Sequence, residues 1–157
     1  DTTGVIMFGK TREAEQYYTN QLQEGRIHRI YRGLVEGAIN SDGVVNAPIG
    51  VDPVFDNRRC IDEFGQEAIT EYRVIEHDDT KSLLEFKLLT GRTHQIRVHM
   101  AHIHHPIIGD AMYGTRNKPY TRQALHAYSL TFVPYGQTEA ITVVAPVPSD
   151  LGLEIHT

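Results

Sequence analysis

Arginine and histidine side chains, which can bind an anion, gather between Leu89 and Gly114. This stretch contains Gly91-Arg92-Thr93-His94-Gln95-Ile96-Arg97-Val98-His99 and later His105-Pro106-Ile107-Ile108-Gly109-Asp110. Arg97 stands between two apolar residues, where a guanidinium needs a carboxylate or a phosphate as its partner and contacts either with two hydrogen bonds. The pattern predicts a site for an anion or a buried carboxylate. A simple ion pair in the core explains Arg97 equally well.

Five histidines in the same stretch are candidate metal ligands: His94, His99, His102, His104 and His105. Zinc needs three or four converging ligands, and this stretch has no cysteine, no glutamate at helical spacing and no His-Glu-x-x-His pattern. We therefore expect no metal ion, and we expect the histidines to cap loops or to contact phosphate. A histidine-metal hydrolase is kept as an alternative, which elemental analysis for zinc would exclude.

Tyr31 lies in an alternating stretch close to Arg26, Arg29 and Arg32. An aromatic ring among arginines can stack on an exposed base while the guanidinium groups hold backbone phosphates. A strand tyrosine that packs on its neighbours explains the same residues. The sequence has no glycine-rich phosphate loop, Ser-His-Asp signature or Cys-His pairing, so nothing supports nucleotide hydrolysis or acyl transfer.

Length and composition indicate one domain without a membrane span. The chain has 157 residues, 40% of them apolar, and no apolar run approaches the ~18 residues that a membrane helix needs. The single cysteine, Cys60, suits a reducing cytoplasm. The net charge of −5 argues against bulk electrostatic binding of nucleic acid. However, the stretch from Arg92 to Arg122 contains five basic residues, among them Arg116 and Lys118, and one acidic residue, Asp110. One surface could therefore still be positive.

Local patterns predict mostly strands with two helices. We expect a buried strand around Val5-Ile6-Met7-Phe8, a helix capped by Thr11 and stopped by Gly25, and a helix capped by Thr93 that runs to about Ile103. Strands are expected at 26–37 with a hairpin return at 44–45, in a hairpin over 68–88, and in a pair around Pro134-Tyr135-Gly136; 48–65 is predicted to be irregular. The fold class is therefore α+β, with a mixed, mostly antiparallel sheet flanked by a few helices.

The stretch from Gly91 to His99, followed by His105 to Asp110 and by Tyr113-Gly114, resembles the central motif of the RluA-type RNA pseudouridine synthase family. Asp1-Thr2-Thr3-Gly4-Val5 resembles the tail of the family's catalytic-loop motif, Ile30 to Gly37 its tyrosine strand, and Leu125-His126-Ala127 a late strand. The resemblance covers nearly the whole chain. It implies the fold of a pseudouridine synthase catalytic domain over 1–157.

The family's nucleophilic aspartate lies in a His-Arg-Leu-Asp segment, two residues before the position that Asp1 matches. The resemblance therefore implies that the chain is an N-terminally truncated fragment, that Asp1 is not the nucleophile, and that the fragment alone is inactive. A separate RNA-binding domain could precede it.

The resemblance implies cofactor-free isomerisation of uridine to pseudouridine in ribosomal or transfer RNA, after the base flips out of its helix or loop. Arg97 would pair with the upstream aspartate, Tyr31 would stack on the target base, and Leu125 would pack beside that ring. RNA contacts are expected from Arg92, His94, His99 and Arg32. We expect a cytoplasmic monomer whose partner is RNA. A catalytically inactive RNA-binding module of the same fold is the alternative.

Overall fold

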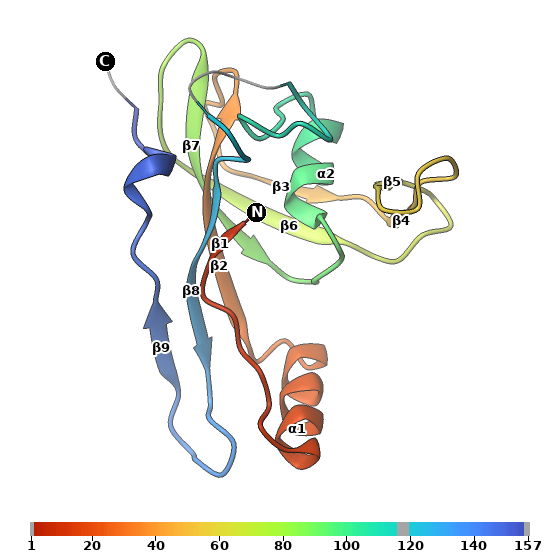
Figure 1. Cartoon of the computed structure of the whole chain (residues 1–157), viewed down its shortest axis with the longest axis vertical. Helices are drawn as coiled ribbons and strands as arrows, with labels where there is room; N and C mark the ends of the chain where they lie inside the picture. Colours follow the sequence, from red (N-terminus) through yellow and green to blue (C-terminus); the bar gives the residue numbers. More distant parts are fainter. Residues whose placement is uncertain (1, 116–119, 156–157) are drawn as a thin grey trace.

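The computed structural model of the 157-residue chain describes residues 2–115 and 120–155. Strands dominate these residues, and seven of them form one sheet in the order β1-β8-β2-β7-β6-β3, with β9 also paired to β8 (Figure 1). The bounds of these strands are β1 (Thr3–Gly4), β2 (His28–Glu36), β3 (Gly43–Asn46), β6 (Ile69–His77), β7 (Lys81–Leu88), β8 (Leu125–Phe132) and β9 (Ile141–Val144). The pairing of β1 with β8 is parallel and the other pairings in the sheet are antiparallel. The α+β prediction is therefore confirmed.

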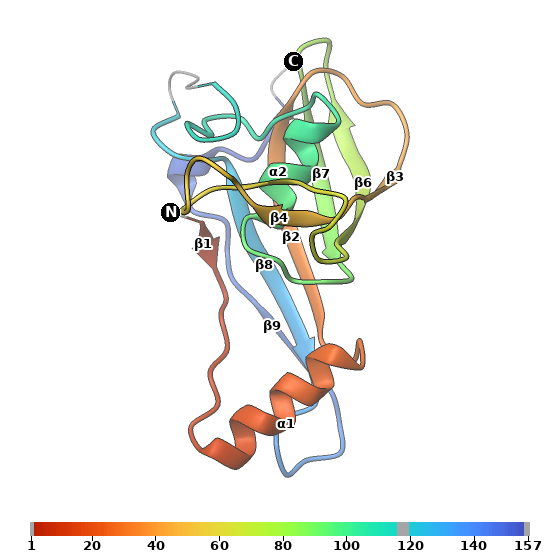
Figure 2. The same cartoon turned by 90° about the vertical axis from the view of Figure 1, so that its right-hand side faces the viewer.

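Two α-helices, α1 (Arg12–Gln23) and α2 (Gln95–His102), lie on the same side of the sheet, near its opposite ends (Figures 1 and 2). A small hairpin of β4 (Ile49–Val51) and β5 (Arg59–Ile61) projects beside α2. A short 3-10 helix, η1 (Ser149–Leu151), follows β9 on the other side of the sheet. The two helices thus divide this face of the sheet into two regions.

Helix α1 forms for the local reasons that its sequence predicts. The Thr11 hydroxyl accepts a hydrogen bond of 3.1 Å from the Ala14 N–H, which satisfies one of the unpaired donors of the first turn. Glu13 and Glu15 place negative charge at the positive end of the helix. The helix ends just before Gly25, which adopts φ +72°. Cap, helix and stop are all as predicted.

Helix α2 begins differently from the prediction. Its N-cap is His94, in the left-handed conformation with φ +57° and without a side-chain cap, so Thr93 does not cap the helix. The predicted inner side is correct: Ile96 and Met100 are buried, and Ile103, the C-cap, packs against the same core.

Apolar side chains bury the α2 end of the sheet on both faces. Ile96 and Met100 of α2 pack on the sheet residues Val35, Leu84, Phe86 and Leu125. On the opposite face Leu34, Leu83 and Ile108 pack against Leu151 and Leu153 of the C-terminal segment. Neighbouring residues such as Leu34 and Val35 serve opposite faces because side chains alternate along a strand. This part of the sheet is packed on both faces, so it fixes the position of α2.

Three predicted elements differ in the structure. The run Val5–Phe8 is not a buried strand: only Thr3–Gly4 pairs with β8, and Ile6 and Phe8 are 75% and 78% exposed. The segment 44–45 belongs to β3, which pairs with β6 rather than returning along β2. The region 48–65 contains the β4–β5 hairpin rather than irregular chain alone. Hairpins β6–β7 and β8–β9 form as predicted.

Across the described ranges, no helix is both long and apolar enough to cross a membrane.

Candidate active site

Five of the seven predicted site residues line one small cavity of about 150 Å³. They come from β2, from the loop before α2, from α2 itself and from the start of β8: Tyr31, Arg92, His94, Arg97 and Leu125. Thr2, Leu88, Gln95 and Ile96 complete the lining. Side chains far apart in the sequence therefore meet at one place, beside the well-packed end of the sheet.

Arg97 is held by a two-pronged ion pair with Asp110. Its Nε donates to Oδ2 at 2.8 Å and its Nη2 donates to Oδ1 at 2.9 Å, with the Arg97 side chain 12% exposed and the Asp110 side chain fully buried. The interpretation of Arg97 as half of a core ion pair is thus correct, and Asp110 is the only acid of the 92–122 stretch. The pair fixes the guanidinium beside the cavity.

Asp110 is tied to its own loop as well. Its Oδ1 also accepts hydrogen bonds from the backbone N–H groups of Met112 and Tyr113, at 3.0 and 3.1 Å. Burial alone would raise the pKa of Asp110, but the hydrogen bonds from Arg97 and from the backbone lower that pKa below its ordinary value. Asp110 is therefore an ionised anchor for Arg97, and both of its oxygens are occupied.

Tyr31 presents its ring to the cavity at an irregularity in the sheet. The β2–β8 register shifts between Ile30 and Tyr31, so that Tyr128 of β8 has no directly opposed partner. Such bulges re-aim side chains and are common beside active sites. Tyr31 packs against the cluster that contains Leu125, which fits the role expected for Leu125. Burial raises the pKa of the Tyr31 phenol, partly offset by the charge of Arg29, so the hydroxyl stays protonated near neutral pH.

His94 links the cavity to the loop after α2. Its Nδ1 lies 2.8 Å from the hydroxyl of Tyr113, which also accepts the N–H of Arg59 at 2.8 Å. The Arg97 guanidinium lies 5.1 Å from the centre of the Tyr113 ring, within cation–π range. Burial and the charges of Arg97 and Arg59 lower the pKa of His94, so its imidazole is neutral near pH 7. Tyr113 belongs to the stretch that resembles the family motif, but its position along the sequence did not indicate its contacts with His94 and Arg97.

Arg92 and Gln95 brace the loop that enters α2. The Nε of Arg92 donates to the carbonyl of Glu67 at 2.8 Å, and its backbone N–H donates to Oε1 of Gln95. Gln95 is buried and also bonds Thr70, Thr90 and the carbonyl of Ile69. Sequence reasoning missed Gln95, because two of its partners, Ile69 and Thr70, come from β6, which no local pattern places beside it.

His99 and Arg32, the other two predicted site residues, lie elsewhere. His99 is fully buried, with Nδ1 2.8 Å from the Thr70 hydroxyl and Nε2 2.9 Å from the Ala47 carbonyl. It is a core residue, which corrects the expectation that it contacts RNA. Its spacing of three residues from Ile96 places it on the inner side of the helix, which the sequence analysis did not predict.

Arg32 follows Tyr31 on β2 and therefore points to the other face of the sheet. Its guanidinium lies 3.9 Å from the centre of the Tyr128 ring and 3.7 Å from Glu85. Any RNA contact of Arg32 would thus be separate from the cavity.

Among residues 2–115 and 120–155, no three His, Cys, Asp or Glu side chains converge as metal ligands would. The histidines of the central stretch point to different partners: His94 to Tyr113, His99 to Thr70, and His105 to the carbonyl of Glu36. Asp1, Arg116 and Lys118 lie outside the described residues.

These features define what the cavity can do chemically. It offers an aromatic ring for stacking, a fixed guanidinium for an anion and an apolar wall at Leu125. The one buried carboxylate beside it, Asp110, is occupied by Arg97. A reaction at this site that needs a free carboxylate would have to receive it from a segment outside the described residues.

Comparison with known proteins agrees with this geometry. A family model described as RNA pseudouridylate synthase matches residues 1–102. The chain is 41% identical over 165 aligned residues to ribosomal large subunit pseudouridine synthase D of Xylella fastidiosa, covering 96% of the chain and 50% of that protein. It is 40% identical to an uncharacterized RNA pseudouridine synthase of Bacillus subtilis, covering 96% of the chain and 51% of that protein.

Among solved structures, human RNA pseudouridylate synthase domain containing 1 superposes with a TM-score of 0.77 at 30% identity, over 92% of this chain and 64% of that one. The chain spans about half the length of the curated relatives that it matches. The family match covers well over half of the chain, and it includes Tyr31 and Arg97 of the cavity. The chain belongs to the RNA pseudouridylate synthase family.

Proposed function

We propose that this chain is part of the catalytic domain of an RNA pseudouridine synthase that isomerises uridine in ribosomal RNA. The observation that carries the proposal is the meeting of Tyr31, Arg97 and Leu125 at one cavity in a chain of this family. The curated relatives named ribosomal large subunit pseudouridine synthase D favour ribosomal over transfer RNA. The complete protein would act in the cytoplasm, a reducing compartment that suits the single cysteine.

Arg97 would hold the nucleophilic aspartate, which family resemblance places just before Asp1. Its Nε and Nη2 are taken by Asp110, and the Arg97 side chain lines the cavity. Thr2 lines the same cavity, so a residue shortly before it is within reach of the guanidinium. An arginine there keeps the incoming carboxylate ionised and aimed in a site that burial would otherwise make unfavourable for charge.

The reaction rearranges bonds without a net change in composition. The N1–C1′ glycosidic bond of uridine breaks, the uracil turns, and a C5–C1′ bond forms; the C5 proton is lost and N1 gains one. No electron acceptor or cofactor is required. The uridine must leave its helix or loop to enter so small a cavity. Tyr31 would stack on the flipped uracil, and Leu125 would support the ring. The neutral Tyr31 phenol would relay the C5 proton, accepting it on the hydroxyl oxygen while its own proton passes to solvent.

Tritium release tests this proposal, because the C5 hydrogen of uridine is lost in the reaction. The full-length gene product would be incubated with ribosomal RNA that carries 5-tritiated uridine and that comes from cells lacking the enzyme. We expect release by the wild type, at least a hundredfold slower release by Arg97→Ala, and partial activity of Arg97→Lys, which keeps the charge but loses the two-pronged contact.

Arg122→Ala is the matched control, because Arg122 also forms an ion pair and its side chain is only 18% exposed, but it does not line the cavity. Circular dichroism would confirm that each variant is folded. Near-normal release by folded Arg97→Ala would refute the assigned role of Arg97. Salt-dependent RNA binding without any release by the wild type would instead identify an inactive RNA-binding module.

A further inference from the structure

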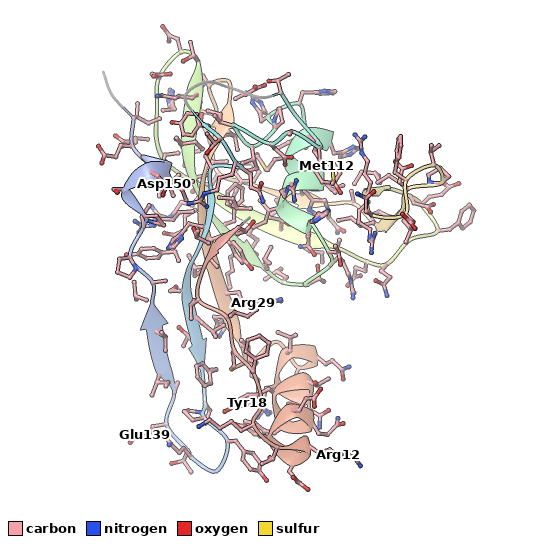
Figure 3. The ribbon with its side chains drawn as sticks, in the orientation of Figure 1. Arg12, Tyr18, Arg29, Met112, Glu139 and Asp150 are labelled. Atoms are coloured by element: carbon pink, nitrogen blue, oxygen red, sulfur yellow. The ribbon has the colours of Figure 1, made fainter. Side chains whose placement is uncertain are left out.

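A second, larger hollow lies between α1 and the sheet. Its volume is about 570 Å³, and its walls are the segment Val5–Phe8, the inner side of α1 at Tyr18 and Leu22, and β2 at Arg29 and Tyr31. Tyr31 lines both this hollow and the small cavity. In Figure 3 the Arg29 side chain projects from β2 on the side of the sheet where the two helices lie. The two sites are therefore neighbours on one face.

Arg29 is a partly buried cation without a counter-charge in the described part of the chain. No Asp or Glu there forms an ion pair with it, and its Nε is buried without a hydrogen-bond partner. Burial lowers the pKa of Arg29, although not enough to remove its charge near neutral pH. The other arginines near Tyr31 are paired: Arg32 with Glu85, and Arg97 with Asp110.

The loop before α2 makes room for this guanidinium. Gly91 lies against it so closely that a Cβ at position 91 would overlap Nη1 of Arg29. A glycine is needed there for the close approach, since any side chain would push the Arg29 head group aside. Gly91 thus leaves space for the Arg29 head group between the hollow and the loop of Arg92 and His94.

A partly buried, unpaired guanidinium is costly unless an anion meets it, and its planar fork suits a phosphate. The hollow is lined mainly by apolar side chains, including the exposed Ile6 and Phe8, and Glu15 of α1 is the one acid in its lining. A cation next to an apolar wall fits a nucleotide of a single strand, whose phosphate takes the charge and whose base packs on the wall.

We propose that Arg29 binds the phosphate next to the uridine that enters the cavity at Tyr31, and that the hollow beside α1 holds the flanking nucleotide. This inference rests on the proposed function for the identity of the ligand as RNA. Arg29 would be a positioning residue: it anchors the strand on one side of Tyr31, so that the base to be flipped arrives at the ring.

The salt dependence of RNA binding tests this role. The full-length gene product would bind fluorescein-labelled decauridylate at several KCl concentrations. Each phosphate contact to a single strand contributes about 0.7 to the slope of log affinity against log salt. We expect Arg29→Gln to make this negative slope less steep by about 0.7 and to weaken the affinity about tenfold. Arg29→Lys should keep the slope.

Arg73→Gln is the control, because Arg73 pairs with Glu85 together with Arg32 on the other face of the sheet; it should leave the slope unchanged. An unchanged slope and affinity in folded Arg29→Gln would overturn the proposal.

If Arg29→Gln does not fold, phenylglyoxal modification of wild-type Arg29 tests the proposal instead. Protection by decauridylate supports the phosphate contact; equal modification with and without RNA, or none in either case because another protein segment covers Arg29, contradicts it.

The two proposals can fail separately. A less steep salt dependence in Arg29→Gln, together with no tritium release by the wild type, would support the phosphate contact and refute the synthase activity. Normal tritium release with an unchanged slope would keep the activity and refute the role of Arg29.

Discussion

The regions around the two helices differ in how their polar groups are satisfied. Around α2, buried polar side chains have partners: Arg97 has Asp110, Gln95 has Thr70 and Thr90, and His99 has Thr70 and Ala47. Around α1, Ala14 is the only buried residue of the helix, Ile6 and Phe8 are exposed, and the buried Nε of Arg29 has no partner. The polar groups around α2 are therefore satisfied within the protein. The region around α1 has exposed apolar surface and an unpaired cation that can contact a ligand.

This difference suits a site that must hold reacting groups still and also receive a strand. Catalytic groups act best when packing and hydrogen bonds fix them in advance. A surface that binds RNA needs accessible cations and apolar area instead. Variants in each region test whether the two regions differ in this way.

Asp110→Asn should have the largest effect on stability. It removes the charge that compensates the largely buried Arg97, and breaking a buried ion pair on one side costs about 3–5 kcal/mol. Urea unfolding followed by far-ultraviolet circular dichroism would measure the loss, since the chain has no tryptophan to report it by fluorescence. Asp150→Asn is the control: Asp150 pairs with Arg122 but is 61% exposed, so its loss should cost under about 1 kcal/mol. Equal losses for both variants would contradict a preorganised α2 region.

His99→Gln should have an intermediate effect, and one that depends on pH. Burial lowers the pKa of His99, so the unfolded chain binds its proton more readily than the folded one. The stability that neutral His99 contributes is complete above its unfolded pKa of about 6.5, and it is lost as the pH falls below that value. At pH 8 the variant should lose about 1–3 kcal/mol, because Thr70 and Ala47 lose their buried partner.

Between pH 8 and pH 5 the wild type should lose stability more steeply than His99→Gln. Exposed His28→Gln serves as the control for the effect of removing a histidine. Parallel stability curves for the wild type and His99→Gln would show that His99 does not titrate as a core residue. Binding of decauridylate should be the same in both proteins.

Thr11→Ala should have the smallest effect, about 1 kcal/mol, through loss of the cap on the Ala14 N–H. Tyr17 and Tyr18 also tie α1 to the end of β8 and the turn after it, so the cap adds a local contribution to these contacts. Thr19→Ala is the matched control, since the Thr19 hydroxyl is exposed and bonds the Glu15 carbonyl within the helix rather than a free N–H of its first turn. Thermal unfolding would compare the two. If Thr19→Ala is as destabilising as Thr11→Ala, the cap is not what supports α1.

Local signals predicted the parts of the fold that local contacts build. The cap and stop of α1 and the β6–β7 hairpin depend on residues close together in the sequence, and both are correct. The partner of β3 is not predictable in this way: the turn before Gly43 looks like a hairpin turn, but β3 pairs with the distant β6. The run Val5–Phe8 failed because apolar character alone does not supply a neighbouring strand.

The site was predictable to a similar extent. The motif placed Arg97, Tyr31 and Leu125 together, and Asp110, as the only acid in its stretch, was available as the partner of Arg97. The buried position of His99 was not predicted: the motif implied an RNA contact, whereas the fold places His99 in the core. The roles of Gln95 and Tyr113 were not predicted either, because their partners include residues from distant segments that only the fold brings near.

The most direct test of the central claim is the pseudouridine content of large-subunit ribosomal RNA after reaction with the full-length protein, wild type or Tyr31→Phe. Nucleoside digestion and chromatography separate pseudouridine from its isomer uridine. We expect new pseudouridine with the wild type and, because the phenol hydroxyl at the cavity is lost, at least a hundredfold slower formation with folded Tyr31→Phe. Equal formation by the two proteins, or none by the wild type, would contradict the assignment of this cavity as a pseudouridine synthase active site.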